Sequence, residues 1–432
     1  MATKNKFLRA TICASAGLLA LSAGTTLRAA SQENKTPGPP SHRGRKPGAQ
    51  KQQAPPNIFR QQVLSARPLK MLYYFDDARG FQSLESHIPG ITVLAPQCFT
   101  VDGGGHIEGT VPPRVREAAR AARLPIMPLL FNQGFDRATV SALLHDEVAQ
   151  ENAVRAMSDI ANRGDEVGFQ IDLENIAPAD HRFFTLFVKR AAARLHQDGR
   201  LLSVAVTPQF SEAQPKGRQR KKTLRGEWSG AYEYRSLGQY ADLITLMTYD
   251  HSSRNGPPGP IAGYGWVKTA IKFAVERVPR TKLLLGLPLY GREWSVEGDN
   301  SPSRSLTYDA VRALIERPDV HVQWNARWRS PWFEYSDGLS QRTVWYEDSR
   351  SLKEKLSLMQ DYGLRGFAAW RLGDEGPDFW PLVEGAKKDQ GRGSVRPKRP
   401  AVAAKQKTKI ESHLNANPDS QARTGERVGQ TR

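Results

Sequence analysis

Residues 167–174 read Val-Gly-Phe-Gln-Ile-Asp-Leu-Glu, a short apolar run that ends in two acids. Such runs suit strands that are buried on both faces of a parallel sheet, and they recur on either side of this one. Amphipathic helical patterns separate them, most clearly at residues 180–195 and 351–362. The predicted strands are residues 71–75, 91–99, 124–131, 167–173, 201–207, 243–249, 283–290 and 366–370. Eight strands that alternate with helices predict an α/β fold, a (β/α)8 TIM barrel.

The connection between the seventh and eighth predicted strands is longer than one helix requires. Residues 292–345 therefore predict an insertion on the rim of the barrel. This segment contains Trp324, Trp328 and Trp332, which recur at intervals of four residues. Aromatic side chains on one face can stack on sugar rings, but the same spacing also serves to pack the insertion against the barrel. We favour the packing interpretation.

The formal net charge of +18 is concentrated at the two ends of the chain. Residues 1–60 hold ten Lys or Arg and one acid, and residues 387–432 hold twelve against four acids. Residues 61–386, which contain the predicted barrel, carry the remaining +1. A specific nucleic-acid-binding domain would carry its basic residues on the folded surface, so the sequence predicts none. Residues 31–60 and the C-terminal segment have few apolar side chains, and we expect a disordered linker and a disordered tail.

Residues 1–30 have the three-part layout of a secretory signal peptide. Three basic residues precede an apolar run at residues 10–23, and small residues near Ala30 offer a cleavage site. The apolar run is shorter than the roughly 20 residues that a transmembrane helix needs, so no transmembrane span is predicted. The sequence therefore predicts export, with the protein secreted or located in the periplasm or cell envelope.

Asp172 and Glu174 lie at the carboxyl end of the fourth predicted strand, the end at which active sites of such barrels form. Residues two apart on a strand point to the same face, so both acids should face the barrel mouth. Neighbouring carboxylates repel, which raises the pKa of one of them. A protonated carboxyl beside an ionised one is what glycoside cleavage requires. Taken alone, the pair is equally consistent with two solvated acids at a strand end.

Other candidate site residues follow the remaining strands. Asp250 either lines the site or caps the helix that follows, and Arg292 either reaches the substrate or pairs with an acid. Tyr73, Tyr74, Asp76 and Asp77 lie at the mouth end of the first strand, and the sequence does not show which of them faces inward. His and Cys residues show no metal-ligand spacing, so neither a metal nor another cofactor is predicted. The candidates after the sixth, seventh and eighth strands are Met247, Tyr249, Asp250, Tyr290, Arg292 and Trp370.

Several of these segments together resemble glycoside hydrolase family 18. The first is similar to the signature Asp-Gly-x-Asp-x-Asp-x-Glu, with Gly168, Asp172 and Glu174 at its second, sixth and eighth positions. The resemblance covers about residues 69–382 and is closest to the branch that includes bacterial spore-cortex and cell-wall glycosidases. The segments that match, in the family's order, are residues 167–174, 247–250, 283–294 and 366–375.

The resemblance implies substrate-assisted, retaining hydrolysis of β-linked N-acetylglucosamine glycans, either peptidoglycan or chitin-type. Glu174 would protonate the glycosidic oxygen while the 2-acetamido carbonyl of the substrate attacks C1. Asp172 would orient the acetamido group and stabilise the oxazolinium that forms. Tyr249 would hydrogen-bond the acetamido oxygen, and Trp370 would form the floor under the sugar. The remaining candidates for substrate binding are Gln170, Met247, Asp250, Tyr290 and Arg292.

Val167 and Gln170 depart from the signature, because they replace its first and second Asp. In the family, the second Asp exchanges a hydrogen bond with the residue that aligns with Asp172. Gln170 cannot take a proton, but its amide can donate a hydrogen bond. We therefore expect Gln170 to donate to Asp172 and to keep that carboxylate ionised.

Two other functions remain open. The chain could be a glycan-binding protein, a lectin of the cell envelope that has lost turnover; the retained Glu174 argues against this function and Gln170 keeps it open. It could also be an envelope scaffold that acts through its basic ends. Those ends would be attracted to anionic envelope polymers, or would have no partner at all. We expect the protein to be a monomer.

Overall fold

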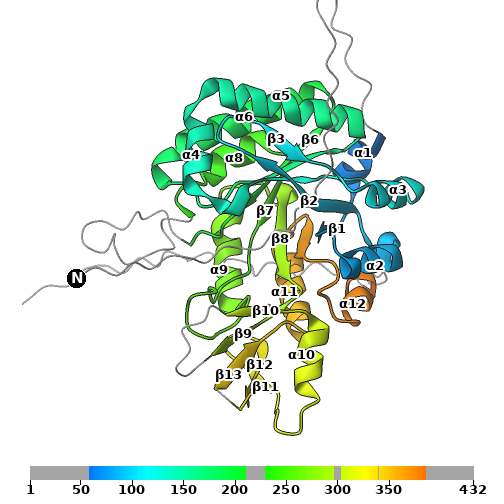
Figure 1. Cartoon of the computed structure of the whole chain (residues 1–432), viewed down its shortest axis with the longest axis vertical. Coiled ribbons are helices and arrows are strands. Elements are labelled where there is room, and N and C mark those ends of the chain that lie inside the picture. The colour runs from blue at the N-terminus through cyan, green and yellow to red at the C-terminus, as the bar shows by residue number, and fades with distance from the viewer. Residues whose placement is uncertain (1–57, 211–228, 296–302, 339, 386–432) are drawn as a thin grey trace, which may run out of the picture. The chain divides into compact units, whose positions relative to one another are not determined.

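The computed structural model describes residues 58–210, 229–295, 303–338 and 340–385. The predicted signal peptide, most of the predicted linker and the predicted tail lie outside these residues. Eight parallel strands form the main sheet (Figure 1). They are β1 (Leu69–Tyr74), β2 (Val93–Val101), β4 (Leu129–Asn132), β5 (Gly168–Asp172), β6 (Leu201–Val206), β7 (Leu243–Leu246), β8 (Leu283–Pro288) and β14 (Gly366–Trp370).

The eight-stranded sheet closes on itself. Consecutive strands pair in parallel around it, and β1 pairs with both β2 and β14. A short strand, β3 (Ile107–Gly109), adds to β2 in the antiparallel direction. The predicted (β/α)8 barrel is therefore confirmed.

Helices surround the barrel, and several begin at a side chain that caps them. Asp146 accepts hydrogen bonds from two main-chain N–H groups at the start of α5, and Asp348 forms a capping box with Ser351 at the start of α11. Within the described residues, no helix has both the length and the apolar composition needed to cross a membrane. The helices are α1 (Ile58–Ser65), α2 (Ala78–His87), α3 (Pro113–Ala121), α4 (Arg137–His145), α5 (Glu147–Gly164), α6 (His181–Gln197), α8 (Tyr234–Tyr240), α9 (Tyr264–Val275), α10 (Tyr308–Ile315), α11 (Ser349–Asp361) and α12 (Phe379–Gly385).

The barrel strands contribute side chains to two cores. One set fills the barrel interior, including Met71, Leu129 and Leu284, and the other packs beneath the surrounding helices. Val63 and Phe59 of α1 pack against the interior set at the end where the strands begin. The first helix therefore covers that end, and the carboxyl ends of the strands are left to form a site.

An insertion follows the seventh barrel strand, as predicted. It forms a second, antiparallel sheet with strand order β10-β9-β13-β12-β11. This sheet and α10 enclose a separate apolar cluster that includes Val311, Phe333 and Val344, and Figure 1 shows them at its lower end. The strands are β9 (Gly291–Ser295), β10 (Arg304–Leu306), β11 (Gln323–Asn325), β12 (Ser330–Ser336) and β13 (Gln341–Trp345).

Two strand boundaries differ from the prediction in ways that affect the site. The third barrel strand begins at Leu129 rather than at residue 124, because Pro125 and Pro128 have no N–H to donate to a ladder. The fourth ends at Asp172, so Glu174 lies beyond the strand rather than on it. The strand pleat alone therefore does not set the direction of the Glu174 side chain.

Candidate active site

The two acids predicted to be catalytic lie together at the carboxyl end of β5. Asp172 is buried, and burial raises its pKa to about 7. Glu174 is half-buried, and its pKa is raised well above the usual range by burial and then by the negative charges of Asp172 and Asp250. The raised pKa favours the protonated form of Glu174, while Asp172 is close to its midpoint near neutral pH. The pair combines an available acid with a neighbouring carboxylate.

The expected hydrogen bond from Gln170 to Asp172 is wrong. Gln170 is fully buried, and its Nε2 donates to Ser203 Oγ at 2.8 Å and to Thr245 Oγ1 at 3.0 Å. Ser203 is the register partner of Gln170 on β6, so its hydroxyl lies level with the amide. Among the described residues, nothing hydrogen-bonds the buried Oδ1 of Asp172. The amide therefore does not keep Asp172 ionised, and burial dominates its pKa.

Ser203 and Thr245 were not predicted from the sequence as site residues. With Gln170 they form a neutral polar layer in the barrel interior, next to the acids along the strands. A signal was present, because each is a single polar residue inside an otherwise apolar strand, LLSVAV in β6 and LITL in β7. A buried hydroxyl in such a run requires a hydrogen-bond partner, and Gln170 provides one.

Tyr73 is the aromatic residue of β1 that faces the barrel interior. Its side chain belongs to the interior core and lies close enough to Asp172 and Glu174 for their charges to raise its pKa, after the larger effect of burial. Tyr74 points to the other side of the strand, where its hydroxyl donates to Asp76 at 2.7 Å. Asp76 forms an ion pair with Arg114, and Asp77 caps α2. Of the four candidates, Tyr73 is therefore the one that faces the interior.

Tyr249 and Trp370 lie at the same mouth. The Tyr249 ring passes over Gly286 of β8, where an added Cβ would lie 2.9 Å from Cε1 of the ring. Asp172 and Glu174 are among the groups that raise the pKa of Tyr249, again after burial. The ring of Trp370 is 5.2 Å from that of Tyr73, centroid to centroid. Tyr249 therefore borders the carboxylate pair, and Trp370 packs against Tyr73, which borders the pair as well.

Asp250, Tyr290 and Arg292 form one hydrogen-bonded group. The Tyr290 hydroxyl and Arg292 Nη2, the latter at 2.7 Å, both donate to Oδ1 of Asp250. Arg292 Nη1 also donates to the Ser252 carbonyl at 2.9 Å. Asp250 does not cap a helix, because α9 begins only at Tyr264. This group ties β9 to the loop after β7, and the charge of Asp250 acts on Glu174.

The tryptophans of the insertion lie on a hairpin and not on a helix, although their spacing is helical. Trp332 of β12 stacks on Trp345 with centroids 5.6 Å apart, and Trp328 packs edge-on against His251 at 5.0 Å. Trp328, Trp332 and Trp345 belong to one cluster with Trp370 and other aromatic residues of the mouth. Arg350 covers the ring of Trp324. Trp328 and Trp332 thus join the insertion to the barrel mouth, in agreement with the packing interpretation.

Met247 is buried just after β7, and its main-chain N–H donates to the Val206 carbonyl.

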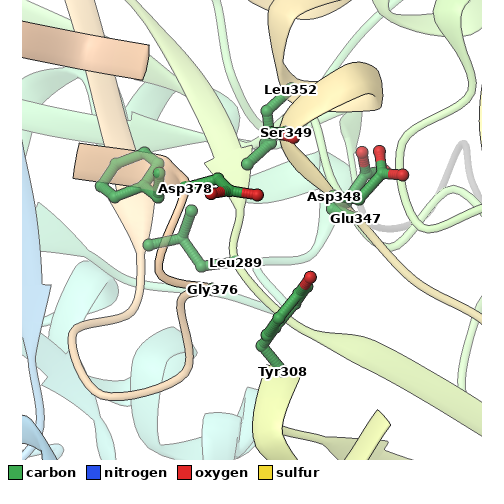
Figure 2. Close-up of a pocket in the computed structure, with 9 residues that line it drawn as sticks. Leu289, Tyr308, Glu347, Asp348, Ser349, Leu352, Gly376 and Asp378 are labelled. Carbon is green, nitrogen blue, oxygen red and sulfur yellow. The ribbon is translucent and has the colours of Figure 1, made fainter. Parts of the chain in front are cut away.

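A small pocket lies apart from the predicted site residues and is lined by Tyr308, Glu347 and Asp378 among others (Figure 2). None of the predicted site residues lines this pocket. In the part of the chain that the structure describes, no group of three or more His, Cys, Asp or Glu could hold a metal ion. The candidate active site is therefore the barrel mouth around Asp172 and Glu174.

A comparison with known protein families shows which family the chain belongs to. The model of "Glycosyl hydrolases family 18" matches residues 133–375, which is more than half of the chain. The chain belongs to this family. The resemblance noted in the sequence is thereby confirmed, and the protein is a family 18 glycosidase.

Individual relatives of this family 18 chain include bacterial enzymes. It is 27% identical over 313 residues to the cortical fragment-lytic enzyme of Bacillus subtilis (strain 168), covering 70% of this chain and 69% of the relative. A chitinase from Chromobacterium violaceum ATCC 12472 is similar in structure, with TM-score 0.66, 28% identity, and 74% of this chain and 98% of the other covered. The spore cortex-lytic enzyme SleL of Bacillus megaterium QM B1551 has the same fold, with TM-score 0.67, 24% identity and 74% of each chain covered.

Gln170→Asp should change how activity depends on pH. The new carboxyl would lie in the buried layer next to Asp172, and its negative charge would raise the pKa of Asp172 further. The acidic limb of kcat/KM should therefore move to higher pH and gain an ionisation, because coupled carboxyls titrate together. The profile would be measured on a chromogenic N-acetylglucosamine substrate between about pH 4 and about pH 9.

The matched control is Gln170→Asn, which shortens the side chain equally but adds no charge. Its profile should coincide with that of the unmodified protein. Coincident profiles for Gln170→Asp and the unmodified protein would show that position 170 is not electrostatically coupled to Asp172.

Proposed function

We propose that the protein is an exported glycosidase that hydrolyses β-linked N-acetylglucosamine glycans of the peptidoglycan or chitin type. The reaction is substrate-assisted and retaining. Glu174 protonates the glycosidic oxygen, and the carbonyl oxygen of the substrate's own 2-acetamido group attacks C1. Asp172 accepts from the acetamido N–H and stabilises the positive charge of the oxazolinium. Water then opens the oxazolinium, with Glu174 acting as the base.

The observation that carries this proposal is the pairing of Asp172 and Glu174 in one buried setting. Burial and the negative charge of Asp172 raise the pKa of Glu174 and so favour its protonated form, as a general acid requires. Asp172 has a pKa of about 7, so an approaching N–H donor or a positive charge would favour its ionised form. Tyr249 and Trp370 border the pair and offer a hydroxyl and an aromatic face for the N-acetyl sugar.

Peptidoglycan and chitin-type glycans both contain β-linked N-acetylglucosamine. The similarity to cortical fragment-lytic enzymes favours peptidoglycan fragments, and the similarity to a chitinase favours chitin oligosaccharides. Either glycan lies outside the cytoplasm, which agrees with the signal-peptide layout of residues 1–30.

The purified protein would be incubated separately with peptidoglycan sacculi, with solubilised cortex-type fragments and with chitin oligosaccharides. Mass spectrometry of the products identifies the cleaved bond, and proton NMR of the first products reports the anomer. We expect fragments with a reducing N-acetylglucosamine that is initially in the β configuration, because the mechanism retains configuration. Initial α products would contradict the mechanism. Glycan binding with no products from any substrate would instead support the lectin function.

A further inference from the structure

A buried side chain from the neighbouring barrel strand holds the main chain of Glu174. Asn132, the last residue of β4, is fully buried. Its Oδ1 accepts from the Glu174 N–H at 3.0 Å, and its Nδ2 donates to the Glu174 carbonyl oxygen at 3.2 Å. The same Nδ2 donates to the Asp136 carbonyl at 3.1 Å. One amide thus satisfies both main-chain polar groups of the residue that carries the acid.

The residues on either side of Glu174 are also held. The Tyr232 hydroxyl donates to the Leu173 carbonyl at 2.9 Å. Asn175, which has a φ of 57°, accepts from Arg137 Nε and Nη2 at 3.1 and 2.8 Å. The chain therefore turns sharply straight after the acid, and side chains of other elements hold that turn in place.

The two hydrogen bonds between the Asn132 amide and the Glu174 main chain, here called the Asn132 clamp, replace the hydrogen bonds that a neighbouring strand would make. β5 ends at Asp172, so the hydrogen bonds of the barrel do not extend to Glu174. A proton donor must lie within hydrogen-bond reach of the leaving oxygen, roughly 2.6–3.2 Å between heavy atoms. A displacement of about 1 Å can cost on the order of 100-fold in rate. An acid on an unsupported turn would often exceed that tolerance.

We infer that Asn132 is a positioning residue for the proton donor, an inference that rests on the proposed function. It fixes the Glu174 main chain and, through it, the distance from the carboxyl to the glycosidic oxygen. The primary amide supplies, on one short planar group, both the acceptor and the donor that the Glu174 peptide groups use. Asp at this position keeps the acceptor but loses the donor, and Ala loses both.

The test uses two substrates that depend differently on the proton donor. An N-acetylglucosamine oligosaccharide has a poor leaving group and needs full protonation, whereas an aryl glycoside with an acidic phenol needs little. Asn132→Ala and Asn132→Asp should lower kcat on the oligosaccharide by about 100-fold. They should lower kcat on the activated aryl glycoside by less than about 10-fold and change KM by no more than about 3-fold. Thermal unfolding of each variant would be measured in parallel.

The matched control is Gln150→Ala. Gln150 is also a buried amide that donates to a main-chain carbonyl, that of Leu144 at 2.6 Å, but it lies on α5. This variant should lose comparable stability and keep both activities. An equal loss on both substrates in the Asn132 variants, or a change in KM alone, would overturn the positioning role while leaving the proposed function intact. No turnover by the unmodified protein on either substrate would overturn both.

Discussion

Glu174→Gln should lower turnover on N-acetylglucosamine oligosaccharides by roughly 10²–10⁴-fold or more, because the amide cannot donate the proton that the leaving oxygen requires. The change is nearly isosteric, and the Asn132 clamp contacts only the main chain of this residue, so the fold should be retained. Initial rates on a defined oligosaccharide would be compared with binding of the same glycan by calorimetry. We expect turnover to fall and affinity to stay within a few-fold of the unmodified value.

Glu147→Gln is a matched control for this variant. Glu147 lies at the start of α5 with its side chain 80% exposed, and its ion pair with Arg190 is on the surface. Removing one surface charge has little effect on stability or on chemistry at the mouth. Near-normal turnover by Glu174→Gln would remove Glu174 from the role of proton donor.

Asp172→Asn should abolish most of the activity and, at neutral pH, stabilise the fold. The loss of activity, on the order of 10²-fold or more, follows from removing the charge that stabilises the oxazolinium. The gain in stability follows from the raised pKa of Asp172. Burial moves that pKa from 3.8 to about 7, so over this range the folded protein holds a proton that the unfolded chain releases.

The ionisation of Asp172 makes the fold less stable as pH rises. Since the unfolded state binds fewer protons over this window, the free energy of unfolding decreases as pH rises from about 4 to about 7 and then levels off. Asp172→Asn removes this ionisation. The variant should therefore exceed the unmodified protein in stability by on the order of 4 kcal/mol at pH 8, and the difference should shrink towards pH 4.

Denaturant unfolding at several pH values between these limits measures the difference. Asp180→Asn provides a contrast, because Asp180 is also buried but accepts from Ser141 at 3.0 Å and lies 2.9 Å from His145 Nε2. Its replacement should lower stability, since it weakens contacts that are already formed. If Asp172→Asn lowered stability at pH 8 as Asp180→Asn does, burial of the Asp172 carboxylate would not be what destabilises the fold.

The barrel could be predicted from the sequence because its strands are buried on both sides. The strand β8 is a continuous apolar run, and others such as β6 are interrupted by a single polar residue, a pattern typical of strands buried in a parallel sheet. The ends of the strands are harder to predict, because a strand ends where the neighbouring strands no longer offer hydrogen bonds to it. The pattern of apolar residues around Pro125 and Asp172 does not contain that information.

The carboxylate pair at the barrel mouth could be located from the sequence because the type and spacing of Asp172 and Glu174 are local properties. The partner of Gln170 could not be predicted in the same way, since it depends on the register between β5, β6 and β7, whose residues lie far apart in the chain. The contact between Asn132 and Glu174 could not be predicted for a related reason. An Asn at a strand end usually begins a turn, and only the three-dimensional structure shows that its amide binds Glu174.

The separate apolar cluster of the insertion has an evolutionary consequence. Because Val311, Phe333 and Val344 pack among themselves and not into the barrel, substitutions within this cluster can accumulate without disturbing the packing around Asp172 and Glu174. Trp328 and Trp332 of the β11–β12 hairpin reach the aromatic cluster at the mouth. We therefore expect natural variation or directed selection at these two positions to alter glycan recognition at the mouth while Asp172 and Glu174 stay in place.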